Sequence, residues 1–153
     1  MLQQTQVKTV LPYFKKFTKK FPTLESLSKS NEKQILKMWE GLGYYRRARN
    51  LYTSSKQLVT FYKGKLPNTL NEIKNLPGIG DYTGNALLGL VYDQPRIAID
   101  GNVKRVLARN LNKKEAKIDF NKLVNSNSKM LFNNKKRNAD FVEALMELSL
   151  IHI

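Results

Sequence analysis

The sequence predicts an all-α protein built around a helix-hairpin-helix. Apolar residues recur at helical spacing along most of the 153 residues, and no segment alternates between apolar and polar residues as a half-buried strand does. The run from Leu76 to Gly80 is a turn that contains Pro and Gly and lies between two helical segments, so it predicts a hairpin spanning residues 69–91. We expect one partial domain over residues 1–148, followed by a doubtful tail over 149–153.

Capping and breaking residues predict where the first helices begin and end. Apolar positions at helical spacing predict a first helix that stops at Phe21-Pro22. Thr23 is expected to cap a short helix after it. Ser30 or Asn31 is expected to cap the next helix, which ends in the glycine-containing segment that follows.

A longer helix precedes the hairpin. Its expected inward residues are Tyr45, Ala48, Leu51, Tyr52, Leu58, Val59 and Tyr62. On this pattern Arg46, Arg47 and Arg49 face solvent or a phosphate. The second arm of the hairpin, residues 86–91, is apolar almost all round, which predicts a buried helix.

Apolar positions also predict the core of the hairpin and of three later helices, the first of which begins at Asp100. The expected core residues are Leu70, Ile73 and Leu76 in the first arm; Val103, Val106, Leu107 and Leu111; Phe120, Leu123, Val124 and Leu131; and Phe141, Ala144, Leu145 and Leu148.

Composition favours a polyanionic partner. The chain has 27 Lys and Arg against 12 Asp and Glu, a formal net charge of +15, and such a positive field attracts nucleic acid. A solvated face explains individual charge runs such as Lys15-Lys16 equally well. Charge alone therefore points to DNA or RNA without locating a binding surface.

Composition also limits cofactors and compartment. The chain has no cysteine, so it can hold neither a disulfide nor a thiolate-bound cluster. No apolar run approaches the length of a membrane span, and no signal-peptide pattern follows Met1. We expect a cytoplasmic monomer that has no membrane partner and is associated with the bacterial nucleoid.

The hairpin turn is a candidate anion site. Gly78 and Gly80 would allow backbone conformations that a Cβ forbids, and the amides that open the following helix lack partners inside it. In so basic a chain, the expected anion is a DNA phosphate. Further on, Asp100 places a carboxylate at the start of the next helix. Asp-Gly-Asn before an apolar helix is also ordinary capping chemistry, so from spacing alone Asp100 is either a cap or a catalytic group.

Two further segments, Met1–Val7 with its Gln-Gln-Thr-Gln run and Trp39–Asn50 with its Gly-Leu-Gly-Tyr-Tyr run, complete a set of four motifs. Together, in this order, they resemble the MutY family of adenine DNA glycosylases, within the helix-hairpin-helix GPD superfamily. The resemblance runs to Leu148, and the doubtful tail begins where the sequence departs from the family. It implies an endonuclease III-like core that acts on double-stranded DNA containing adenine opposite 8-oxoguanine or guanine.

The resemblance implies base excision repair by hydrolysis of the N-glycosidic bond. This reaction needs a proton for the departing adenine and a negative charge that stabilises the oxocarbenium ion of the sugar. Asp100 matches the stabilising carboxylate. Tyr82 stands where bifunctional relatives of the endonuclease III type carry a lysine, and a phenol with a pKa of about 10 cannot form a Schiff base. A monofunctional enzyme is therefore expected, with packing of Tyr82 on a helix face as the alternative.

The general acid of the resembled family is a glutamate two residues before the motif that begins at Met1. The first carboxylate in this chain is Glu25, which does not match that position. We therefore expect activity reduced by about a hundred- to ten-thousandfold, or nil. The family also carries a 4Fe-4S cluster just beyond this region. No metal ligands are predicted in this chain, and only the hairpin carbonyls are expected to take a monovalent cation, as related hairpins do.

The resemblance also assigns contacts to DNA. A base is excised only after it has been flipped out of the stack. Residues matching Gln3, Gln4 and Thr5 probe the duplex at the lesion, and the residue matching Tyr44 inserts its ring beside 8-oxoguanine. Gly43 lets the backbone approach the DNA groove there, and packing of Tyr44 in the core is the alternative. Contacts with the DNA backbone are assigned to Arg46, Gly78, Gly80, Thr83, Asn102 and Lys104.

Two other functions remain open. A non-catalytic helix-hairpin-helix module that only grips DNA is favoured by the missing acid and opposed by the presence of Asp100 and Tyr82. An endonuclease III-type glycosylase and lyase is opposed by tyrosine at position 82.

Overall fold

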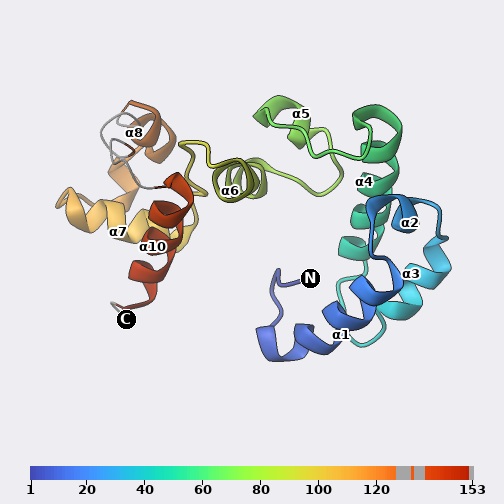
Figure 1. Ribbon diagram of the computed structural model, residues 1–153. Helices are drawn as coiled ribbons and strands as arrows, with labels where there is room; N and C mark the ends of the chain where they lie inside the picture. The colour runs from blue at the N-terminus through green and yellow to red at the C-terminus, as the bar shows by residue number, and fades with distance from the viewer. Residues whose placement is uncertain (127–131, 133–136, 152–153) are drawn as a thin grey trace. The chain divides into compact units, whose positions relative to one another are not determined.

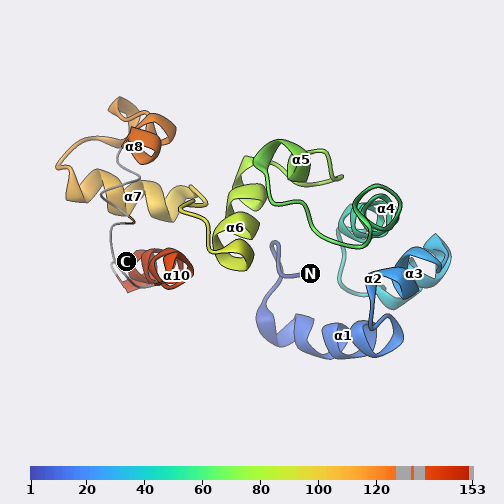
Figure 2. The same cartoon turned by 45° about the horizontal axis from the view of Figure 1, so that its top comes forward.

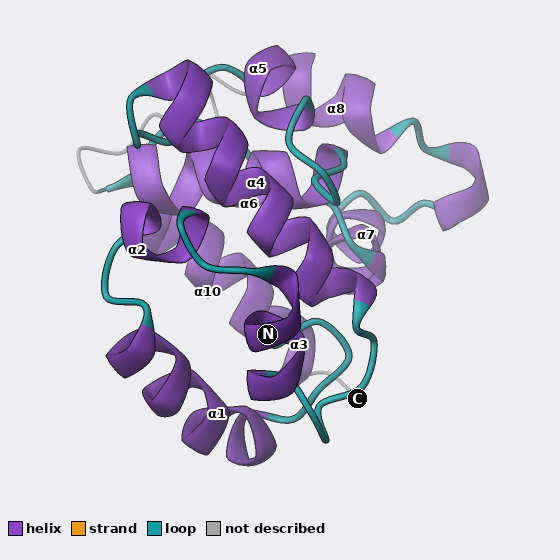
Figure 3. Cartoon of the chain, turned by 90° about the vertical axis from the view of Figure 1, so that its right-hand side faces the viewer, coloured by secondary structure: helices purple, strands orange, loops and turns teal. Residues whose placement is uncertain are grey.

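The computed structural model describes residues 1–126, 132 and 137–151, and within them it contains helices and turns but no strand (Figures 1 and 3). The all-α prediction is confirmed for these residues. Leu131 and residues 152–153 of the predicted tail lie outside them. In the described part of the chain, no helix has both the length and the apolar character that crossing a membrane requires.

The chain divides into two compact units. Unit 1 comprises Met1–Pro67 and Asn75–Gly78, and unit 2 comprises Asn68–Lys74 and Ile79–Ile153. The turn of the hairpin therefore belongs to unit 1 up to Gly78, whereas both of its helices belong to unit 2. The partial domain expected over residues 1–148 stays a prediction.

Unit 1 contains four helices whose ends follow the predicted caps. Thr23 and Ser26 form a reciprocal capping box, in which the Ser26 amide donates to the Thr23 hydroxyl at 3.1 Å. Of the two candidate caps for the next helix, Asn31 is the one used, since its side chain accepts from the Gln34 amide at 2.8 Å. The helices are α1 (Val7–Lys20), α2 (Leu24–Ser28), α3 (Glu32–Met38) and α4 (Arg46–Tyr62).

The core of unit 1 gathers around Trp39, which is 1% exposed. The ring of Phe17 meets it edge-on, with 6.2 Å between centroids. The Tyr52 hydroxyl reaches back to the Ser30 carbonyl at 2.8 Å and ties α4 to the start of α3. The buried cluster consists of Val10, Phe17, Phe21, Leu27, Ile35, Trp39, Leu42, Ala48 and Tyr52.

Unit 2 contains the two helices of the hairpin, which lie side by side (Figure 2). Gly84 allows their close approach, because a Cβ there would lie 2.8 Å from Leu70 Cδ1 and 3.2 Å from Ile73 Cγ2. Asp93 accepts from the Ala139 amide at 2.8 Å and so helps to fix the start of the last helix. The elements are α5 (Leu70–Lys74), α6 (Asp81–Tyr92), α7 (Gly101–Asn110), the 3-10 turn η1 (Glu115–Lys117), α8 (Phe120–Ser126) and α10 (Asn138–Ile151).

The prediction that the second hairpin arm is buried all round was wrong. α6 buries only the face that carries Gly84, Leu88 and Gly89, and Val91 is 60% exposed. The helix packs against α5 and α10, and its apolar residues Leu90, Val91 and Tyr92 are exposed.

Five other residues expected to point inward are exposed: Tyr45, Leu51, Leu111, Ala144 and Leu148. In α4 the buried stripe runs through Ala48, Tyr52 and Ser55, and Leu51 is about 100° away from Tyr52 around the helix. Apolar periodicity indicates a helix but does not choose between neighbouring stripes. Contacts with other helices make that choice.

Candidate functional site

The predicted duplex probes form a tight turn ahead of α1. The Thr5 amide donates to the Leu2 carbonyl at 3.1 Å, and the Thr5 hydroxyl donates to the Gln3 carbonyl at 3.3 Å. Gln4 has a φ of 56°, the left-handed region that residues with a Cβ rarely adopt. The side chains of Gln3 and Gln4 are exposed, so the turn presents two amide groups to solvent.

The Gly43–Tyr44 loop presents an aromatic ring. Gly43 has a φ of 67° and Tyr44 a φ of 49°, so the chain passes through the left-handed region twice in succession. The Trp39 indole donates to the Gly43 carbonyl at 3.1 Å, which anchors the loop to the core. Tyr44 is 63% exposed, so its ring is available for contact with a partner.

Arg47 joins these two segments. One terminal nitrogen, Nη1, donates to the Met1 carbonyl at 2.7 Å and to the Gln3 carbonyl; the other, Nη2, donates to the Leu42 and Gly43 carbonyls at 3.4 Å each. A single guanidinium therefore hydrogen-bonds to the backbone of both segments, the N-terminal turn and the Gly43–Tyr44 loop.

The expectation that Arg47 faces solvent or phosphate was wrong. Its guanidinium lies 5.4 Å from the ring centre of Tyr44 and 5.6 Å from that of Trp39, within range of cation-π attraction. Arg49 pairs with Glu32 at 2.8 Å, and Arg46 is exposed as predicted. The sequence did not predict these contacts of Arg47, because its main partners are backbone carbonyls, which every residue has.

The hairpin turn requires glycine at only one of its two predicted positions. Gly78 has a φ of 80°, and a Cβ on it would lie 2.3 Å from Asn50 Nδ2 and 3.2 Å from Asn50 Cβ. Gly80 caps α6 with a φ of −98° and has open space around its Cβ position. The expectation that Gly80 adopts a backbone conformation reserved for glycine was wrong. Thr83 is half-buried in the first turn of α6.

Asp100 lies at the start of α7 and caps it. Its Oδ1 accepts from the Val103 amide at 2.8 Å, so the prediction that Asp100 caps this helix is confirmed. Asp100 also acts on Tyr82, which is 44% exposed. Partial burial raises the pKa of the Tyr82 phenol above its ordinary value, and the negative charge of Asp100 raises this pKa further. The structure thus brings the two predicted catalytic residues within electrostatic reach of each other.

The remaining assigned residues lie near the start of α7. Asn102 accepts a hydrogen bond from Arg105, and the Lys104 ammonium lies 5.8 Å from the ring centre of Phe120. Gly80, Tyr82 and Thr83 thus lie at the start of α6, and Asp100, Asn102 and Lys104 lie near the start of α7. Within the described residues, no three His, Cys, Asp or Glu side chains gather as metal ligands would.

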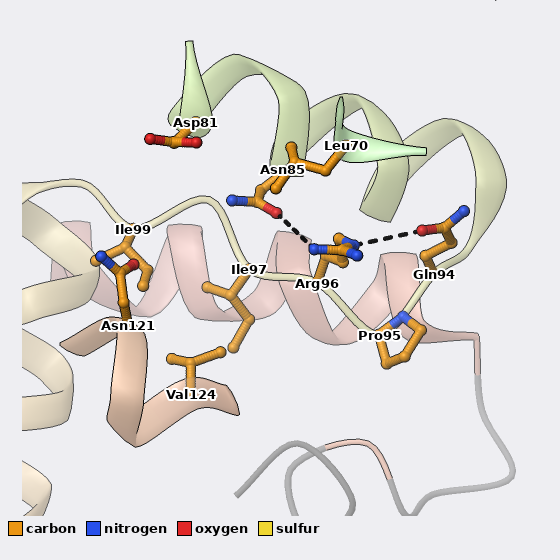
Figure 4. A pocket seen from close by; sticks show the side chains of 10 residues that line it. All are labelled: Leu70, Asp81, Asn85, Gln94, Pro95, Arg96, Ile97, Ile99, Asn121 and Val124. Carbon is orange, nitrogen blue, oxygen red and sulfur yellow. Dashed lines mark hydrogen bonds between the residues drawn. The ribbon is translucent and has the colours of Figure 1, made fainter. Parts of the chain in front are cut away.

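Unit 2 also contains a cavity of about 520 Å³ that the sequence did not predict (Figure 4). Arg96 lines it between Asn85 and Gln94 and donates to Asn85 Oδ1 and Gln94 Oε1, both at 3.4 Å. Its walls combine these polar groups with apolar side chains such as Ile97 and Val124. None of the residues assigned to catalysis or DNA contact lines it.

A sequence model described as the HhH-GPD superfamily of base excision DNA repair proteins matches residues 1–134. An adenine DNA glycosylase from Buchnera aphidicola subsp. Baizongia pistaciae is 43% identical over 99% of this chain and 43% of the relative. The Schizosaccharomyces pombe adenine DNA glycosylase is 36% identical over 99% of the chain and 33% of the relative. The chain thus spans less than half the length of these curated relatives.

Solved structures give the same fold. A thermostable thymine-DNA glycosylase matches with a TM-score of 0.80 and 25% identity over 98% of this chain and 70% of that protein. A trapped covalent complex of endonuclease III with DNA matches with a TM-score of 0.69 and 22% identity, over 95% of this chain and 67% of that protein. The predicted endonuclease III-like fold is therefore confirmed.

Proposed function

The chain belongs to the HhH-GPD superfamily of base excision DNA repair proteins, and we propose that it is the core of a monofunctional adenine DNA glycosylase. Its substrate is double-stranded DNA with adenine opposite 8-oxoguanine or guanine, and the bond hydrolysed is the N-glycosidic bond of that adenine. Support for adenine comes from relatives named adenine DNA glycosylase at 36–48% identity.

The observation that carries the proposal is the position of the Asp100 carboxylate, which caps α7 and whose charge adds to partial burial in raising the pKa of Tyr82. The dipole of a helix favours a carboxylate at its N-terminus, and an anion beneath the sugar stabilises the positive charge that develops as adenine departs. One oxygen of Asp100 accepts from Val103, which fixes the orientation of the carboxylate. The raised pKa of Tyr82 keeps its phenol protonated, so Tyr82 serves as a hydrogen-bond donor at this site.

Groups of both units contact DNA in this proposal. Gln3, Gln4, Thr5 and Tyr44 read the lesion, and Arg46 contacts the backbone beside them. Amides at Gly78 and Gly80, the Thr83 hydroxyl, Asn102 and Lys104 hold phosphates. The carbonyls of the same turn offer the oxygen ligands that hard cations take, so we also propose a monovalent cation there. The protein acts as a monomer in the bacterial cytoplasm, on the nucleoid.

The test is single-turnover release of adenine from a duplex with adenine opposite 8-oxoguanine. The general acid expected from the resemblance falls before Met1, so the chain is compared with a version extended in both directions from its own genomic locus. We expect the extended version to release adenine and its Asp100→Asn variant to release none. Binding of the duplex without excision by either version would favour a DNA-binding module instead.

Borohydride trapping on abasic DNA tests the other alternative, an endonuclease III-type glycosylase and lyase. A lyase with an amine nucleophile forms an imine that borohydride reduces to a stable adduct, whereas Tyr82 forms none. Tyr82→Lys in the extended protein is the matched control, because it supplies an amine at the same position. An adduct with the unmodified protein would support the lyase and contradict the monofunctional proposal.

A further inference from the structure

We propose that Arg47 is a positioning residue that sets how well the protein discriminates a lesion. It does so by holding the Gln3–Gln4 turn and the Tyr44 loop in one fixed geometry. The inference rests on the proposed function for its effect on DNA. The coupling of the two segments is a property of the free protein and is testable without DNA.

The hydrogen bonds of Arg47 account for the coupling. Its guanidinium donates to four backbone carbonyls, two in the N-terminal turn and two in the loop after Trp39. The planar fork of arginine presents donors in several fixed directions, whereas a lysine ammonium is a single point of charge. No carboxylate pairs with Arg47 among the described residues. Its two terminal nitrogens therefore donate only to the two segments that it joins, while its buried Nε has no hydrogen-bond partner among the described residues.

Backbone conformation gives a second line of argument. Gln4 and Tyr44 both have positive φ values, 56° and 49°, and each directly follows a residue whose carbonyl accepts from Arg47, Gln3 and Gly43 respectively. Residues with a Cβ occupy this region at a cost in free energy, and surrounding contacts must maintain it. Arg47 supplies such a contact on both sides.

The aromatic contacts complete the arrangement. The guanidinium lies 5.4 Å from the centre of the Tyr44 ring and 5.6 Å from that of the buried Trp39 ring. Tyr44 remains 63% exposed, so the contact orients the ring without burying it. A ring held in this way loses less conformational freedom on entering a duplex than a mobile ring would.

Hydrogen exchange in the free chain tests the coupling. We expect Arg47→Met to accelerate exchange at least about tenfold, the equivalent of about 1.4 kcal/mol, in both segments, at the Thr5 and Leu42 amides that donate to the Leu2 and Trp39 carbonyls. Arg49→Met removes the same charge from the same helix and should leave both segments unchanged. Unchanged exchange in Arg47→Met, or faster exchange in only one segment, would overturn the inference.

Arg47→Lys is the control that separates a local effect on the two segments from general unfolding. If Arg47→Met also accelerates exchange at the buried residues of α4, the lysine variant becomes decisive. It keeps the charge but not the fork, so we expect faster exchange in both segments with the α4 core unchanged. Full restoration of slow exchange by lysine would show that charge alone is sufficient and would refute the positioning role.

Binding measurements test the consequence for DNA. The quantity is the affinity for a duplex with adenine opposite 8-oxoguanine divided by the affinity for a matched duplex. We expect Arg47→Met to reduce this ratio about tenfold, while Arg49→Met weakens both duplexes by the same factor and keeps the ratio. If the wild-type protein bound both duplexes equally, the proposed function would be contradicted. Hydrogen exchange would still show whether Arg47 couples the two segments. Coupled segments together with an unchanged ratio in Arg47→Met would overturn the role in discrimination.

Discussion

Asp100 accepts a hydrogen bond from the backbone amide of Val103 at 2.8 Å, and its negative charge adds to partial burial in raising the pKa of Tyr82. One side chain therefore caps a helix and also supplies a negative charge to the candidate active site. These two roles respond differently to substitution, because capping needs an acceptor oxygen whereas electrostatic stabilisation needs a negative charge.

Asp100→Asn separates the two roles. Asparagine caps helices as well as aspartate does, so we expect the free energy of unfolding to change by less than about 0.5 kcal/mol. In the extended protein, adenine release should fall at least about a hundredfold because the charge is lost. Denaturation and single-turnover kinetics measure the two effects. Asp100→Ala is the control, and it should lose activity and also about 1 kcal/mol of stability.

Titration of Tyr82 tests its relationship with Asp100. Since the folded-state pKa of Tyr82 is raised, its stabilising contribution is fully present below pH 10 and is lost as pH rises through the folded value. The difference in tyrosinate absorbance between the wild type and Tyr82→Phe isolates this residue. We expect it to ionise above pH 10, and at a lower pH in an Asp100→Asn background. The same midpoint in both backgrounds would show that Asp100 does not act on Tyr82.

Gly89 is expected to be a stability determinant of α6. A Cβ at this position would lie 2.8 Å from the backbone carbonyl of Arg96, so Gly89→Ala should shift backbone and reduce the free energy of unfolding by about 1–3 kcal/mol. Gly101→Ala is the matched control, because the nearest atom to its Cβ is 4.0 Å away. Alanine there should be neutral or stabilising by up to about 1 kcal/mol. Equal urea midpoints for both variants would contradict the close contact.

Duplex binding should depend steeply on salt. A chain with a net charge of +15 releases counterions when it neutralises phosphates, so log K falls linearly with log salt concentration. Lys104→Gln should reduce the slope by about 1, and Lys113→Gln, outside the proposed contacts, should change it less. A flat response of the wild type would remove the basic surface as a DNA contact.

Local chemistry in the sequence determined the helices and the motif. The Thr23, Asn31 and Asp100 caps each bond an amide three residues ahead, so the information needed to predict them lies within one helical turn. The Pro and Gly turn of the hairpin is local in the same sense. These short-range signals were sufficient for the fold class, whereas the proposed catalytic pair came from the resemblance of the ordered motifs to a known family.

Only the tertiary structure decided which surfaces are buried and how the candidate site is held. Leu51 is exposed and Arg47 turns inward because helices and loops distant in sequence determine which faces are covered. The link from Arg47 to Gln3 crosses 44 residues, and its acceptor is a backbone carbonyl that every residue possesses. A sequence pattern therefore cannot encode it. Packing between segments distant in sequence determined the position of this guanidinium.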